Sequence, residues 1–176
     1  MLGIILGIIV VISFLSFLFV IFYNKFQLAV IKIEKGEEDI DLYLQKKHEL
    51  LERTRPVIKK ALKTKEFMNI LDEGNEGLDN FENHMLLKKC YNELFKTLDE
   101  NEKLLKSDTL VKILEELNEN EENIVGAIKF YNDTVVEYNK LVVAFPSKII
   151  ALIKGYKRKD FYNNEKREIF EILNNK

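Results

Sequence analysis

The first 24 residues contain no charged side chain, and 19 of the first 23 belong to the hydrophobic class. As an α-helix, residues 1–23 would be roughly 34 Å long, which exceeds the hydrocarbon core of a bilayer at about 30 Å. In lipid, a helix satisfies every backbone polar group internally. We therefore expect residues 1–23 to form a single transmembrane anchor.

A cleaved signal peptide is the alternative for this segment. It would have a basic start, a shorter apolar core and a small-residue cleavage site, and the segment shows none of these.

Lys25, Lys32 and Lys35 follow the span, whereas no Lys or Arg precedes it. The positive-inside rule thus predicts a single-pass membrane protein with its N-terminus outside and its body in the cytoplasm.

The 27 basic and 29 acidic side chains all lie beyond residue 24, and the net charge is -2. This balance gives no basic footprint for a nucleic-acid partner. Cys90 is the single cysteine, which excludes a disulfide scaffold.

Apolar residues beyond residue 24 recur at spacings of three and four, which is typical of α-helices, and no alternating strand pattern occurs. A first helix should continue from the anchor through Phe26, Val30, Ile33, Ile40, Leu44, Leu51 and Ile58. Pro56 should kink or divide it. After a turn at 72–77, a second helix should present Leu78, Phe81, Met85, Tyr91, Leu94, Leu98 and Leu105.

The third helix has the clearest pattern, an alternating four-then-three seam that predicts packing at a shallow angle. Its positions are Leu110, Leu114, Leu117, Glu121, Ile124, Ile128, Tyr131, Val135, Tyr138, Val142 and Phe145, and only Glu121 is neither apolar nor aromatic. Ser107 and Asp108 offer an N-cap, and Pro146 should end the helix. A shorter amphipathic segment, 147–162, should be interrupted at Gly155.

These patterns predict an all-α fold. An N-terminal transmembrane helix would lead into an elongated antiparallel bundle of three long helices and a shorter C-terminal helix. The predicted division is an anchor at 1–23, a bundle at 24–162 and a helical or frayed tail at 163–176. The basic segment 148–159 should cover the third helix as a fourth bundle helix, and the surface of an anionic membrane is the alternative.

Five of the seven Tyr residues are followed by Asn, including Tyr23-Asn24, Tyr131-Asn132 and Tyr138-Asn139. Tyr at helical spacing usually packs in a core, and a neighbouring Asn can fix register through hydrogen bonds. A ligand-binding surface is the alternative reading. The candidate structural or interaction residues are Tyr23, Asn24, Asp39, Asp41, Tyr131, Asn132, Tyr138, Asn139, Phe145 and Pro146.

Several blocks resemble the LemA family: residues 22–26 after the span, residues 39–50, and the Tyr-Asn, Tyr-Asn and Phe-Pro series over 125–146 with its continuation to 156 and Phe161. The resemblance implies a bacterial protein with an N-terminal membrane helix and an antiparallel bundle, and it implies no reaction. The chain departs from the family pattern in having Glu52 where a Pro is usual, and residues 64–106 match nothing in that pattern.

No candidate motif for catalysis, metal binding or cofactor binding contains all the residues that such a motif requires. His48 begins a zinc-like motif that ends in Glu52 instead of a second His. We therefore expect a non-catalytic interaction or scaffold protein of the bacterial cell membrane, without cofactor or metal. Its partners would be the lipid bilayer, an unidentified protein, or a second copy of the chain. A small-molecule or lipid sensor and an accessory subunit of a membrane enzyme are the alternatives.

Overall fold

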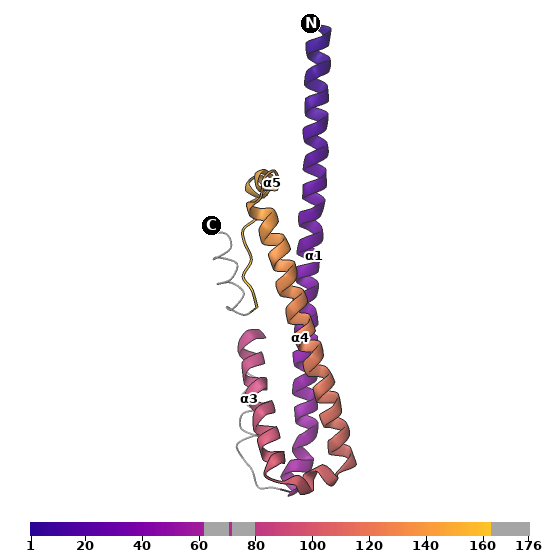
Figure 1. The fold of residues 1–176 in the computed structure, drawn as a ribbon, viewed down its shortest axis with the longest axis vertical. Coiled ribbons are helices and arrows are strands. Elements are labelled where there is room, and N and C mark those ends of the chain that lie inside the picture. Colours follow the sequence, from indigo (N-terminus) through magenta and orange to yellow (C-terminus); the bar gives the residue numbers. More distant parts are fainter. Residues whose placement is uncertain (62–70, 72–79, 163–176) are drawn as a thin grey trace. The chain divides into compact units, whose positions relative to one another are not determined.

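The computed structural model describes residues 1–61, 71 and 80–162. Its elements are α1 (Leu2–Ala61), α3 (Asn80–Asp99), the 3-10 helix η1 (Glu102–Lys106), α4 (Asp108–Val143) and α5 (Ser147–Lys154), as Figure 1 shows. No strand occurs in these described ranges. The predicted all-α fold is confirmed.

The chain forms two compact units, which are described separately below. The first unit contains residues 1–35 and 130–176, and the second contains residues 36–129. Helices α1 and α4 contribute to both units. The predicted division into anchor, bundle and tail stays a prediction, and the tail at 163–176 lies outside the described residues.

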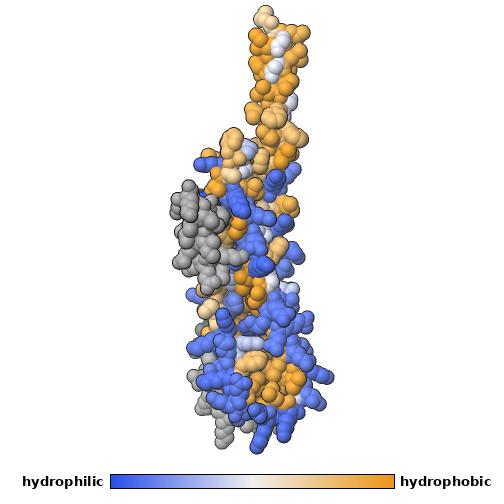
Figure 2. Space-filling view, viewed as in Figure 1, coloured by the Kyte–Doolittle hydropathy of each residue, from blue (hydrophilic) through white to orange (hydrophobic). Residues whose placement is uncertain are grey.

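In the first unit, the N-terminal part of α1 is long and apolar enough to cross a membrane, and its most apolar stretch is not buried against protein. Figure 2 shows this part as almost continuous apolar surface. As predicted, the helix continues beyond the apolar stretch and buries Phe26 and Ile33 on one stripe. The same stripe continues in the second unit with Ile40, Leu44, Leu51 and Ile58.

Pro56 does not divide α1, which continues to Ala61. A proline inside a helix costs one backbone hydrogen bond. The side chains of Leu51, Thr54 and Ile58 are buried on both sides of Pro56. Their packing supplies contacts that hold the helix together across the missing hydrogen bond.

Helix α3 differs from the predicted second helix in its end and in its buried face. It ends at Asp99, and η1 follows it. Phe81, Met85 and Leu105 are exposed, whereas the buried positions are Leu87, Cys90, Leu94, Thr97 and Leu98. Leu94 and Leu98 are buried as predicted. The prediction is wrong at the start of the helix, where the polar Asn83 and His84 are half-buried and Phe81 and Met85 are exposed. The predicted turn at 72–77 and Leu78 lie outside the described residues.

Helix α4 begins as predicted, because the Ser107 hydroxyl accepts a hydrogen bond from the Leu110 amide at 3.4 Å. The helix ends at Val143, and the Phe145–Pro146 peptide bond is cis. The seam is buried at most of its predicted positions in both units, but Phe145 lies beyond the helix and is 83% exposed.

As predicted, Gly155 interrupts the segment 147–162: α5 ends at Lys154, and the chain beyond Gly155 is not helical. Gly155 has a φ of 72°, a left-handed conformation that glycine adopts without steric cost, and the Tyr156 amide donates to the Ala151 carbonyl. Residues 156–162, called here the return segment, are not helical and run back beside α4 in the first unit (Figure 1).

Candidate functional site

Two asparagines of α4 hold the return segment in the first unit. The Asn139 side chain donates to the Lys159 carbonyl and accepts from the Lys159 amide, both at 2.9 Å. The Asn132 side chain accepts from the Tyr162 amide at 2.9 Å. Because Asn132 and Asn139 are seven residues apart, they lie on the same face of α4. Both side chains are buried, so they satisfy backbone groups that water does not reach freely.

Tyr131 and Tyr138, which precede these asparagines in the sequence, also contact the return segment. The Tyr131 hydroxyl donates to the Asp160 carbonyl at 3.2 Å. The Tyr138 ring packs edge-on against Phe26 and Tyr156, with centroid distances of 5.9 and 6.5 Å. Burial raises the pKa of the Tyr138 hydroxyl, and the neighbouring Tyr156 raises it further. This packing argues against a ligand pocket at the two rings.

The remaining candidates of the first unit lie elsewhere. The Tyr23 ring stacks on the Phe19 ring at a centroid distance of 6.1 Å. The Lys154 ammonium lies 5.2 Å from the centroid of the Tyr23 ring. Asn24 is exposed. Phe145 projects from the turn between α4 and α5, where Pro146 contributes to an apolar groove. These residues do not join the cluster around Asn132 and Asn139.

Asp39 and Asp41 belong to the second unit, where both are half-buried on α1. In the same unit, Lys47 of α1 pairs with Glu121 of α4.

The Lys47–Glu121 pair is the main polar feature of the second unit. Lys47 is 0% exposed, and its ammonium also lies 5.0 Å from the centroid of the Tyr91 ring. Burial lowers the pKa of Lys47, and the Glu121 carboxylate opposes that shift. Glu121 is the polar exception in the α4 seam, so the pair explains why a carboxylate occupies a packing position. A buried, paired charge of this kind specifies register more than it adds stability.

Cys90 lies buried near this pair, and burial raises the pKa of its thiol to about 12. Thiolate is the reactive form of cysteine, so we predict that Cys90 reacts slowly while the protein is folded. At pH 8, a thiol-specific reagent should label the folded full-length chain about 10³-fold more slowly than the unfolded chain. The measurement is labelling followed by intact mass. The matched control is Lys46→Cys in a Cys90→Ser background, an exposed site that should react as a free thiol. Equal rates at the two sites would contradict the burial.

His84 supplies a pH dependence in the second unit. Burial lowers the pKa of His84 below 6.5, and the positive charges of Lys47 and Lys88 lower it further. The negative charge of Glu121 opposes this shift. The unfolded chain therefore binds a proton more tightly than the folded chain. Stability should be lost as the pH falls below 6.5, and His84→Gln should lose less over the same interval. Urea unfolding of both proteins at a series of pH values checks this. The same dependence of the free energy of unfolding on pH in both proteins would contradict it.

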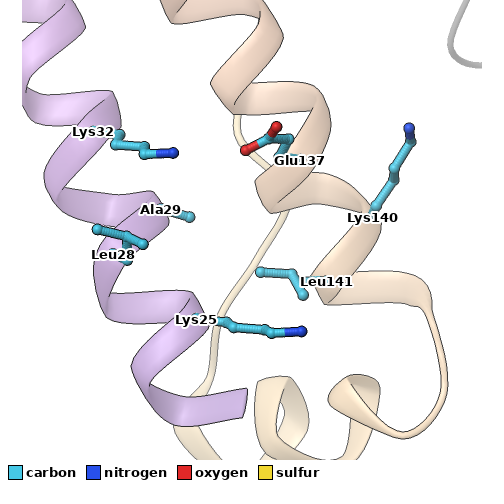
Figure 3. A pocket seen from close by; sticks show the side chains of 7 residues that line it. All are labelled: Lys25, Leu28, Ala29, Lys32, Glu137, Lys140 and Leu141. Atoms are coloured by element: carbon cyan, nitrogen blue, oxygen red, sulfur yellow. The ribbon is translucent and has the colours of Figure 1, made fainter. Parts of the chain in front are cut away.

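A groove of about 290 Å³ lies between α1 and α4 in the first unit (Figure 3). Its lining contains the apolar residues Leu28, Ala29 and Leu141, the three lysines Lys25, Lys32 and Lys140, and one carboxylate, Glu137. Three ammonium groups against one carboxylate favour an anion in this groove.

No group of three or more His, Cys, Asp or Glu side chains within the described ranges is arranged to hold a metal ion. The side chains brought together in the two units bind backbone, pack rings or pair charges. Sequence reasoning missed Lys47, Gln27 and Tyr156; the Gln27 amide donates to the Tyr156 hydroxyl at 2.9 Å. Lys47 could have been found, because it occupies a position of the α1 stripe opposite the polar exception at Glu121.

The fold and these contacts define an all-α protein whose first helix is long and apolar enough to cross a membrane. A family model described as the LemA family matches residues 36–172. No curated protein matches the chain. The chain belongs to the LemA family, as the Tyr-Asn and Phe-Pro blocks predicted.

Proposed function

We propose that this protein is a single-pass membrane protein of the bacterial cell envelope whose helical body is a non-catalytic interaction or scaffold module. The observation that carries the anchor is the unburied apolar part of α1. The basic residues Lys25, Lys32 and Lys35 after the span favour an N-terminus outside and a body in the cytoplasm.

Exposed apolar side chains in the second unit support the interaction role. Leu42 of α1 and Val125 of α4 are 60% and 65% exposed. Lys47 pairs with Glu121, and Arg53 pairs with Glu116, so residue numbers rise along α1 as they fall along α4, which fixes an antiparallel register. In that register the two apolar residues lie within about one helical turn of each other along the unit. A contiguous exposed apolar patch is typical of a protein-binding surface, and we infer that Leu42 and Val125 belong to one such patch.

Photo-crosslinking in cells tests this role. A crosslinking amino acid at Leu42 or Val125 should capture the same protein, which is either a partner or a second copy of the chain. Controls at the exposed charged positions Lys46 and Glu122 should capture it weakly or not at all. If Leu42 and Val125 capture no recurrent protein, not even this chain, the scaffold proposal fails.

A further inference from the structure

A second groove, of about 260 Å³, lies between α1 and α5 in the first unit. Its lining is apolar and includes Leu15, Leu18, Phe19 and Phe22 of α1 and Ile149 and Ile153 of α5. The α1 residues belong to the uncharged stretch of the first 24 residues. Helix α5 therefore lies beside the part of α1 that we propose to be in the membrane.

The outer face of α5 is also apolar. Leu152 is 73% exposed, and Ile149 and Ile153 are exposed as well. Only Ser147, Ile150 and Ala151 of this helix are buried. An eight-residue helix with one face against protein and an apolar face exposed beside a membrane span suits the boundary between headgroups and acyl chains.

Two lysines lie near the end of the groove, at the level where the uncharged stretch of α1 ends. The Lys25 ammonium lies 5.4 Å from the centroid of the Phe22 ring, and the Lys154 ammonium lies 5.2 Å from that of Tyr23. Tyrosine and lysine at the end of a span are typical of the membrane–water interface. These two lysines are thus placed where lipid phosphates would lie.

One stripe of α1 changes from apolar to basic along its length. Leu15, Leu18 and Phe22 line the groove beside α5, whereas Lys25 and Lys32, further along the stripe, line the groove of Figure 3. Spacings of three, four and seven keep these residues on the same side of the helix. An anionic phospholipid has the same order of chemistry, an apolar chain followed by a negative phosphate.

We propose that the groove between α1 and α5 binds an anionic phospholipid. One acyl chain lies against the apolar lining, and the phosphate lies at Lys25 and Lys154. This inference rests on the proposed membrane anchor, because the groove meets acyl chains only if α1 spans the bilayer.

The test uses the absence of tryptophan from the sequence. Ile149→Trp places a single fluorophore in the groove of the full-length chain. The protein is reconstituted in a four-to-one mixture of phosphatidylcholine and phosphatidylglycerol, and bromine, which quenches tryptophan, is carried by one lipid or the other. A lysine near a membrane surface favours anionic lipid by about fivefold. We expect the ratio of anionic to zwitterionic lipid at this fluorophore to exceed the same ratio in the bilayer by about fivefold or more.

Two charge variants show whether the lysines of the groove are responsible. Lys25→Gln with Lys154→Gln should reduce the enrichment to about one. Lys148→Gln with Lys157→Gln removes the same charge from two other exposed lysines and should leave the enrichment in place. Equal enrichment in both double variants would overturn the assigned phosphate position.

A second reporter separates this inference from the anchor itself. Val10→Trp places a single fluorophore in the uncharged stretch, and both brominated lipids should quench it if α1 spans the bilayer. If the Val10→Trp variant is not quenched, the anchor and this inference both fail. If it is quenched but the Ile149→Trp variant shows no anionic enrichment, only the lipid site fails. Quenching of Val10→Trp with no quenching of Ile149→Trp would mean that protein, such as a second copy, occupies the groove, and would also overturn the proposal.

Discussion

Glu121→Gln should destabilise the protein by about 3 kcal/mol, because it leaves the Lys47 charge buried without its partner. The value is at the lower end of the range for a broken buried pair because the Glu121 side chain is 27% exposed. Urea unfolding of the full-length chain in mild detergent, followed by circular dichroism, measures it.

The matched control is Glu116→Gln in the same helix. Glu116 accepts from Arg53 at 2.8 Å, but the two side chains are 44% and 46% exposed, so its loss should cost less than about 1 kcal/mol. The double variant Lys47→Met with Glu121→Leu removes both charges and should be within about 1 kcal/mol of the natural chain, or more stable. Similar losses for Glu121→Gln and Glu116→Gln would contradict the buried pair.

Asn139→Ala should cost about 2 kcal/mol, since it removes two hydrogen bonds that each contribute about 1 kcal/mol. Asn139→Asp should cost more, because a buried carboxylate would face the Lys159 carbonyl without a proton to donate. Hydrogen exchange at the Lys159 amide should become faster in Asn139→Ala, because this amide loses its acceptor on α4.

Asn92→Ala is the matched control, since Asn92 also follows a tyrosine but is exposed on α3. Its effect should be within about 0.5 kcal/mol. If Asn139→Ala left the exchange of residues 156–162 unchanged, the asparagine would not be what holds the return segment.

The seam of α4 could be predicted because every third or fourth residue is apolar and few alternatives fit that spacing. The buried face of α3 could be predicted at Leu94 and Leu98 but not in its first turns, where the polar Asn83 and His84 are half-buried and the apolar Phe81 and Met85 are exposed. The end of α5 was set by Gly155, whose left-handed conformation turns the chain back along α4.

The role of the Tyr-Asn pairs could be predicted only in part from the sequence. Their spacing placed Tyr131 and Tyr138 on one face, but the asparagines were expected to fix the register of the bundle. They bind the backbone of the return segment instead. A sequence shows which residues share a face, whereas a backbone partner 20 or 30 residues away depends on how the chain turns after α5.

Extraction of cell membranes at alkaline pH tests the anchor most directly. Peripheral proteins are released by this treatment, whereas a helix inserted in the bilayer is held by its buried apolar area. The full-length chain should remain in the membrane pellet, and a chain of residues 25–176 should be released. Release of the full-length chain into the supernatant would contradict the membrane anchor on which the proposed function rests.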